Sequence, residues 1–179
     1  MVETSQREVV TSPSAGRGTG IIIGALFGLA WLYNALKFDH KPDWMFHAAY
    51  GATALIVLGG VMRIRDDRKS GVRQPGSTRI AFFVVLAIEI AAIVAAVIVL
   101  SRWHMQQYIV AALAATVGVH FLPLAKIFHA PIYYVTGLAM VAATAAAAVS
   151  LTGAQQVICI AYSAGAILLL TAFSGVIRR

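Results

Sequence analysis

Six long apolar runs, each separated from the next by a short polar break, constrain this chain more than any other feature of its sequence. They cover residues 20–38, 45–62, 80–101, 106–127, 131–152 and 155–177. An α-helix needs about 20 apolar residues to cross the hydrocarbon core of a bilayer. Of the 179 residues, 60% are hydrophobic and only 12% are charged, about half the usual charge of a soluble domain. The sequence therefore predicts an all-α membrane protein, a compact bundle of about six transmembrane helices.

The polar segments predict the domain organisation. Residues 1–19 are rich in Ser, Thr, Gly and charge, and we interpret them as a disordered tail before one transmembrane domain, residues 20–179. The first run has the length of a span, and no small-residue cleavage site follows it, so we interpret it as a helix and not as a signal peptide. The polar stretch 63–79 predicts a loop that contacts anionic lipid headgroups.

The basic residues predict the orientation of the bundle. If they are assigned to alternate sides of the membrane, all but three of the 14 Lys and Arg residues fall on the side of the termini. The three exceptions are Lys37, Lys41 and Arg102. The positive-inside rule then predicts a plasma-membrane protein with both termini in the cytoplasm. Because the net charge of +7 is explained at the membrane surface, we expect no nucleic-acid partner.

A stripe of small residues in the first run predicts close helix packing. Gly20, Gly24 and Gly28 recur at intervals of four and so lie on one helix face. Small residues of this kind let two membrane helices approach closely. The approach is expected either inside the bundle or in a homo-oligomer, and the sequence leaves both open.

Glu89 is the residue that points most strongly to a function. It lies near the middle of the third run, where a carboxylate costs about 3 kcal/mol on insertion scales. We expect it either to stay protonated or to face a partner or water inside the bundle. The functional interpretation is a proton or cation site, and the alternative is an interhelical hydrogen bond that fixes packing.

His120 is the predicted partner of Glu89. Glu89 lies ten residues beyond Arg79, about 15 Å along a helix, and His120 lies eight residues from Phe128, about 12 Å. The two residues are therefore expected at similar depth on consecutive antiparallel helices. A carboxylate–imidazole pair there could hold one proton and pass it on. The alternative for His120 is a hydrogen bond to a backbone carbonyl.

The stretch around His120 carries a resemblance. Residues 117–137 read VGVHFLPLAKIFHAPIYYVTG, and Pro123 within them can interrupt the helix, as at the midplane sites of transporters. The stretch resembles a segment of small bacterial integral membrane proteins of unassigned activity with a His-Phe-Leu-Pro-Leu-Ala core. The resemblance implies a bacterial inner-membrane location and draws attention to His120 and Pro123, but it implies no substrate.

A second group of polar residues is predicted at the outer end of the bundle. Carboxylates and imidazoles are ligands for zinc and copper, so the group could hold a metal. Its spacing matches no established metal motif, and we favour solvated interface residues as the explanation. Its members are Asp39, His40, Asp43, His47 and His104.

One short pattern occurs twice, a Lys followed by His after three residues and by Pro after five. It covers residues 37–42 and 126–131. The pattern raises the hypothesis of two three-helix halves with opposite topology, as in inverted-repeat transporters. Chance recurrence before a helix-starting Pro is the alternative.

Recognised catalytic patterns are missing from the sequence, which has no zinc-protease motif, nucleophile–base pair, carboxylate dyad or Gly-rich phosphate loop. No catalytic residue and no enzyme activity are therefore predicted. We interpret the chain as a small-solute or ion transporter or channel, with proton coupling through Glu89 and His120. The alternatives are a metal- or haem-binding assembly factor and a structural or regulatory partner of another membrane complex.

Overall fold

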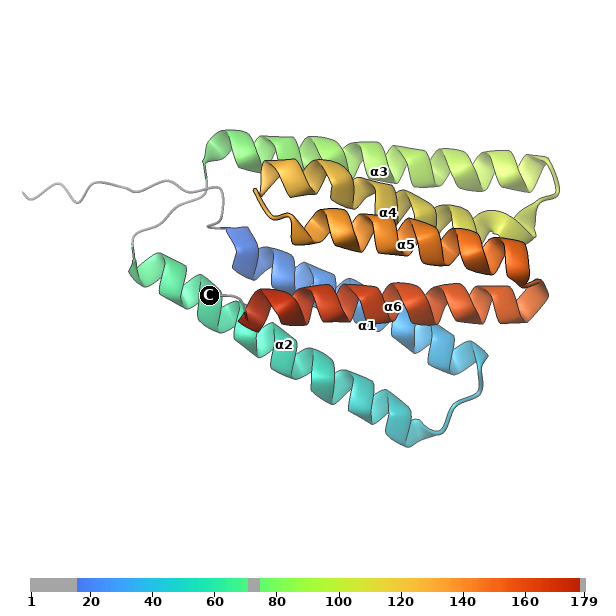
Figure 1. Ribbon diagram of the computed structural model, residues 1–179, viewed down its shortest axis with the longest axis horizontal. Coiled ribbons are helices and arrows are strands. Elements are labelled where there is room, and N and C mark those ends of the chain that lie inside the picture. Colours follow the sequence, from blue (N-terminus) through green and yellow to red (C-terminus); the bar gives the residue numbers. More distant parts are fainter. Residues whose placement is uncertain (1–15, 71–74, 178–179) are drawn as a thin grey trace, which may run out of the picture.

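The computed structural model describes residues 16–70 and 75–177, which form a bundle of long helices without any strand in these ranges (Figure 1). The helices are α1 (Arg17–Phe38), α2 (Asp43–Lys69), α3 (Gly76–Arg102), α4 (Ile109–Ile127), α5 (Ile132–Ser150) and α6 (Gly153–Ile177), and a short 3-10 helix η2 (Gln106–Tyr108) leads into α4. All six α-helices are long and apolar enough to cross a membrane. The predicted fold class, an all-α bundle of six membrane helices, is confirmed.

The polar stretch 63–79 is mostly helical, which corrects the prediction of a loop. Helix α2 continues to Lys69, and α3 already begins at Gly76, directly after Pro75. The sequence RIRDDRK at 63–69 combines good helix formers with charges of both signs, which suit pairing one turn apart.

Of the predicted disordered tail, residues 1–15 lie outside the described residues, and α1 begins at Arg17.

Three helices end in the same way, with a histidine in the left-handed region. After α1, the N–H of Lys41 donates to the carbonyl of Leu36 at 3.0 Å, and equivalent bonds follow α3 and α4. This is the bond of a Schellman cap, in which glycine is the usual left-handed residue. The three are His40, His104 and His129, with φ of 49°, 56° and 49°. The repeated Lys-His-Pro pattern thus has a local role in ending α1 and α4, while the inverted repeat stays a prediction.

Helices α1 and α6 cross closely at the centre of the bundle (Figure 1). A methyl group on Gly165 would lie 2.9 Å from the backbone nitrogen of Leu32 and 3.0 Å from the carbonyl oxygen of Gly28. Further along α1, Gly24 faces the methyl group of Ala172 on α6. Small residues on both helices therefore allow backbone approach, which is the main route to helix association in lipid.

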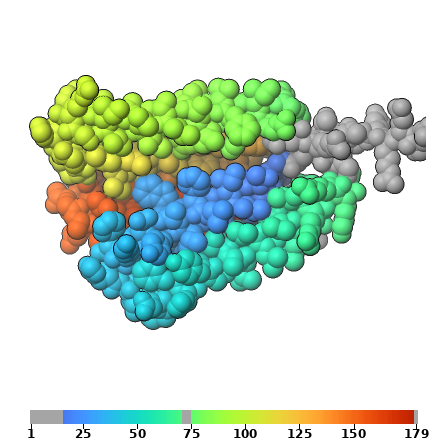
Figure 2. Space-filling view, turned by 180° about the vertical axis from the view of Figure 1, so that it is seen from behind, coloured from blue at the N-terminus to red at the C-terminus, as the bar shows by residue number. Residues whose placement is uncertain are grey.

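Helix α3 lies at the edge of the bundle and packs mainly on α4 (Figure 1). None of its residues is fully buried, and its mean hydropathy of 3.0 is the highest of the six helices. A helix that is apolar all round and exposed is suited to contact with lipid. Seen from behind, α3 and α1 lie on the same face, with α4 visible in the hollow between them (Figure 2).

Six helix ends gather at one end of the bundle, namely the starts of α1, α3 and α5 and the ends of α2, α4 and α6 (Figure 1). Arg17, Arg79 and Lys126 lie at this end, which the charge bias predicts to be cytoplasmic. The large exposed side chains of Trp44 and Trp103 lie at the opposite end. Tryptophans at this level are typical of a membrane–water interface.

Gly165→Ala is expected to lower the thermal stability of the protein in detergent. The new methyl group would meet backbone atoms of α1 that cannot rotate away, and overpacking of this kind costs about 1–3 kcal/mol. Gly51→Ala is the matched control, because Gly51 also lies within a helix and its methyl group would meet nothing within 4 Å. Melting followed by circular dichroism measures both variants, and equal melting temperatures would contradict the assigned helix contact.

Candidate functional site

Glu89 and His120 lie together between α3 and α4. The Oε2 atom of Glu89 is 3.2 Å from Nδ1 of His120, and the two side chains are only 12% and 9% exposed. Glu89 is the middle residue of the 27-residue helix α3, and His120 is just past the middle of α4. The structure therefore brings the two predicted residues together at mid-depth.

The contact between these two side chains is close but is not a well-aligned hydrogen bond. Nδ1 of His120 is buried and has no hydrogen-bond partner among the described residues, although Glu89 lies within ion-pair distance. Buried polar atoms that serve packing are normally paired with good geometry. Nδ1 of His120 therefore faces Glu89 without a hydrogen bond, and the backbone of Val85 on α3 also lies within hydrogen-bonding reach of the imidazole, as the alternative for His120 expects.

A cavity of about 340 Å³ lies beside the pair, between α1, α3 and α4. Its volume is within the ~300–1,000 Å³ range of small-molecule sites. Glu89, His120 and Phe27 line the part of the cavity at mid-depth of the bundle. Arg79, in the first turn of α3, lines its other end. From Arg79 to Glu89 the cavity follows α3 for ten residues, about 15 Å. It therefore leads from a basic end of the bundle to the titratable pair.

Aromatic rings form one wall of this cavity. The rings of Phe82 and Phe128 are 6.0 Å apart, those of Phe128 and Tyr133 are 6.3 Å apart, and those of Tyr133 and Phe121 are 5.5 Å apart, measured between centroids. Such spacings are typical of interacting aromatic pairs. None of these residues was predicted as a site residue from the sequence. The signal that could have identified them is the clustering of four aromatic residues near the basic helix ends.

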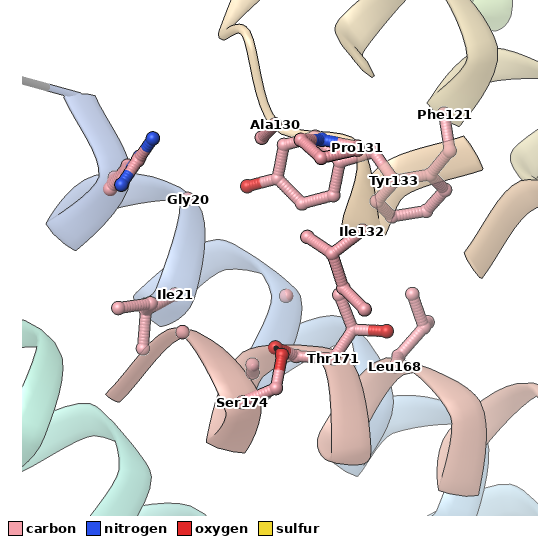
Figure 3. A pocket seen from close by; sticks show the side chains of 14 residues that line it. Gly20, Ile21, Phe121, Ala130, Pro131, Ile132, Tyr133, Leu168, Thr171 and Ser174 are labelled. Atoms are coloured by element: carbon pink, nitrogen blue, oxygen red, sulfur yellow. Dashed lines mark hydrogen bonds between the residues drawn. The ribbon is translucent and has the colours of Figure 1, made fainter. Parts of the chain in front are cut away.

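A second cavity of about 120 Å³ adjoins the first (Figure 3). Both cavities are lined by Gly20, Gly24, Phe121, Tyr133 and Leu168. The hydroxyl group of Tyr133 points towards Gly20 of α1, and a methyl group on Gly20 would lie 2.8 Å from that oxygen (Figure 3). Gly20, predicted for helix packing, thus makes room for a tyrosine hydroxyl at the cavity.

Arg17 lines the second cavity at the start of α1. Its Nε atom is buried and has no hydrogen-bond partner among the described residues. Guanidinium groups carry five N–H donors in a fixed fork, and buried donors are normally paired. Each of the two adjoining cavities therefore has an arginine at the end of the bundle where α1 and α3 begin, Arg17 in the second cavity and Arg79 in the first, and either can accept an anionic group.

Pro123, predicted as part of the same site, lies outside the cavity. Helix α4 continues through it from Ile109 to Ile127. Its side chain is exposed, and it is not among the residues that line the cavity. The contact at mid-depth is made by side chains of α3 and α4, and a functional role of Pro123 stays a prediction.

The predicted outer group of possible metal ligands is not brought together. Among residues 16–70 and 75–177, no three His, Cys, Asp or Glu side chains lie close enough to hold a metal ion. His40 and His104 occupy the left-handed cap positions after α1 and α3, and Asp43 and His47 lie in the first two turns of α2. Metal binding at this end stays a prediction.

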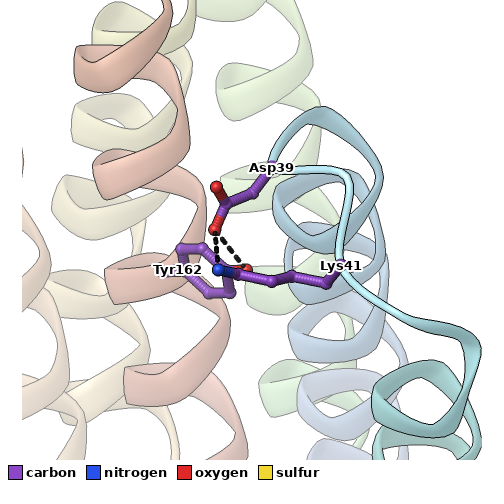
Figure 4. Close-up of polar contacts among 3 residues, drawn as sticks. All are labelled: Asp39, Lys41 and Tyr162. Atoms are coloured by element: carbon purple, nitrogen blue, oxygen red, sulfur yellow. Dashed lines mark hydrogen bonds and ion pairs between the residues drawn. The ribbon is translucent and has the colours of Figure 1, made fainter.

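Asp39, the fifth member of that group, ties the loop after α1 to α6 (Figure 4). Its Oδ2 atom lies 3.1 Å from Nζ of Lys41 and accepts a hydrogen bond of 3.1 Å from the hydroxyl group of Tyr162. The Lys41 contact, with a smaller contribution from Tyr162, holds the pKa of Asp39 below its usual value of 3.8. At neutral pH the carboxylate of Asp39 is therefore charged, and Lys41 and Tyr162 are its partners.

Comparisons with protein families, with curated proteins and with solved structures found no match for this chain. The function is therefore argued from the geometry of the site.

Lys41→Met is expected to raise the pKa of Asp39 towards its ordinary value, and Tyr162→Phe is expected to raise it less, because Lys41 is the main cause of the shift. Since the folded-state pKa is lowered, the contact stabilises the fold above the ordinary pKa, and this contribution is lost as the pH falls through the folded-state value. Carboxyl ¹³C chemical shifts measure the titration. Lys37→Met is the control, and an unchanged pKa in Lys41→Met would contradict the assignment.

Proposed function

We propose that this multi-pass membrane protein is a transporter or channel for a small solute or ion, with proton coupling through Glu89 and His120. The observation that carries the proposal is the contact of these two titratable side chains, 3.2 Å apart at mid-depth and lining a cavity. Ionisable residues inside membrane spans are costly and usually mark ion or proton pathways. A mid-depth acid that is both paired and cavity-lining fits that role.

The net charge of the Glu89–His120 pair explains how binding of a proton could change the affinity of the cavity for a solute. With one shared proton the pair is neutral overall, and without it the pair carries one negative charge. Binding and release of a single proton thus change the electrostatic potential at the mid-depth end of the cavity, where the pair lies. In a site of low polarity this change strongly alters which solute can bind there.

The direction of the cavity supports transport across the membrane. The cavity begins near the starts of α1 and α3, at the end of the bundle that carries Arg17 and Arg79. With both termini in the cytoplasm, as the charge bias predicts, the cavity faces the cytoplasm. We place the protein in the plasma membrane, in accord with its resemblance to bacterial inner-membrane proteins.

A structural role for the pair is the competing explanation, and one observation favours it. Helix α3 packs mainly on α4 and has no fully buried residue, so a polar contact between the two helices could serve to attach it. Such a contact would be worth about 0.6 kcal/mol, the average for interhelical hydrogen bonds in a membrane protein. The two explanations predict opposite effects of neutralising Glu89.

Glu89→Gln is expected to leave the melting temperature unchanged or to raise it, because it removes a costly carboxylate and loses at most one modest contact. His120→Gln and the double variant complete a mutant cycle, measured in detergent from pH 5 to 9. His47→Gln, at an exposed position on α2, is the control. Single variants that each lower the melting temperature, with little further loss in the double variant, would identify the pair as structural.

Glu89→Gln is also expected to abolish proton movement by the protein. Wild-type protein in liposomes should acidify the lumen when a potassium diffusion potential is applied, as reported by a trapped pH-sensitive dye. Glu89→Gln should match protein-free liposomes, because Gln cannot bind and release a proton. His47→Gln should behave as wild type, whereas a loss in that variant alone would favour the metal-binding alternative. Full flux in Glu89→Gln would contradict the proposal.

A further inference from the structure

The charges and rings around the two cavities define a class of solute, an inference that rests on the proposed function. We propose that the solute is an aromatic monocarboxylate, whose carboxylate binds at the arginine end, at Arg17 and Arg79, and whose ring packs on the wall of Phe82, Phe128 and Tyr133.

The arginine end supplies a site for one anionic group. Arg17, Arg79 and Glu89 are the only Asp, Glu, Lys or Arg residues among the described residues that line the two cavities, and Glu89 lies at the inner end. The buried Nε of Arg17 is a donor without an acceptor, and arginine binds carboxylates with paired N–H donors. The starts of α1 and α3 add partial positive charge at the same end.

The aromatic wall selects the body of the solute. Phe82, Phe128, Tyr133 and Phe121 follow one another along the cavity with centroid separations of 5.5–6.3 Å. Phe83 extends the series beside Phe82, at 5.6 Å. Aromatic rings favour other rings in stacked or edge-to-face contact, beyond the gain from burial alone. A flat apolar body is therefore better matched to this wall than a sugar or a metal ion.

The single titratable pair selects a monoanion. A solute that leaves the arginine end and brings its carboxylate to the Glu89–His120 pair can accept one proton there. The carboxylate then becomes a neutral carboxylic acid and the pair gains one negative charge, which the next proton removes. One proton thus makes the whole solute neutral. A phosphate monoester, with a second pKa near 6, would keep a charge after the same step. The ionisable groups of the cavity therefore match a carboxylate.

Binding of 4-phenylbutyrate tests the inference. The full chain is placed in nanodiscs of phosphatidylcholine, which has no net charge, and saturable binding of the radiolabelled probe is measured. The amide 4-phenylbutyramide, which has the same ring and no charge, should compete at least about tenfold less well. Arg79→Gln should weaken binding by about tenfold or more, as expected when a charge-assisted contact is lost. Arg79 is exposed, so this variant is expected to fold even if Arg17→Gln does not.

Arg102→Gln is the matched control, because Arg102 is an exposed arginine at the opposite end of the same helix as Arg79. It should bind the probe as wild type does. Absence of saturable binding, equal competition by the amide, or an equal effect of Arg102→Gln would overturn the inference. Displacement of the probe from wild type when phosphatidylglycerol is included in the disc would assign the cavity to an anionic lipid, and it would also overturn the inference.

Glu89→Gln separates this inference from the proposed function. We expect it to bind 4-phenylbutyrate but, when the probe is added to liposomes, to acidify the lumen no faster than in protein-free liposomes, which the neutral acid crosses by itself. If the probe fails to bind wild type while proton flux still depends on Glu89, the solute class is wrong and proton coupling stands. If binding depends on Arg79 while flux does not depend on Glu89, the site stands and the coupling is wrong.

Discussion

Close backbone contact between α1 and α6 is the constraint on which the rest of the bundle depends. Apolar helices gain little by exchanging lipid for one another, so their association relies on close packing. Gly28 and Gly165 let the two backbones meet, and Ile21, Ala25 and Ala172 form a buried cluster further along the same contact. Helix α2 packs on this pair from one side, and α5 packs on α6 and α4. Helix α3 takes no part in the central contact.

The edge position of α3 accounts for both the cavity and the polar pair. Because α3 packs on α4 and leaves α1 at a distance on the same face, the cavity lies between these three helices. The inner side of α3 is the one place on this helix where a carboxylate avoids lipid, and Glu89 lies there against His120. The edge position of α3 thus leaves space beside a mid-membrane acid that would otherwise face lipid.

Depth along a helix could be predicted from the sequence, but rotation about its axis could not. The helical rise and short connections place Glu89 and His120 at one level, and the structure brings them together. The aromatic wall depends on which way each helix turns, and helices that are apolar all round give no periodic signal for this. The contact of Asp39 with Tyr162 joins residues 123 positions apart, and α4 continues through Pro123 because a single proline does not oblige a helix to break.

The free-energy cost of placing ionisable groups inside the membrane falls mainly on Glu89 and His120, and not on the arginines at the helix ends. Arginines near the helix ends can reach the headgroup level and cost little, so Arg17 and Arg79 alone would not require a function. Glu89 and His120 lie at mid-depth, where charge is most expensive, and no well-aligned hydrogen bond joins their side chains. The presence of two titratable groups beside a cavity at this depth is therefore the observation on which the proposed proton movement rests.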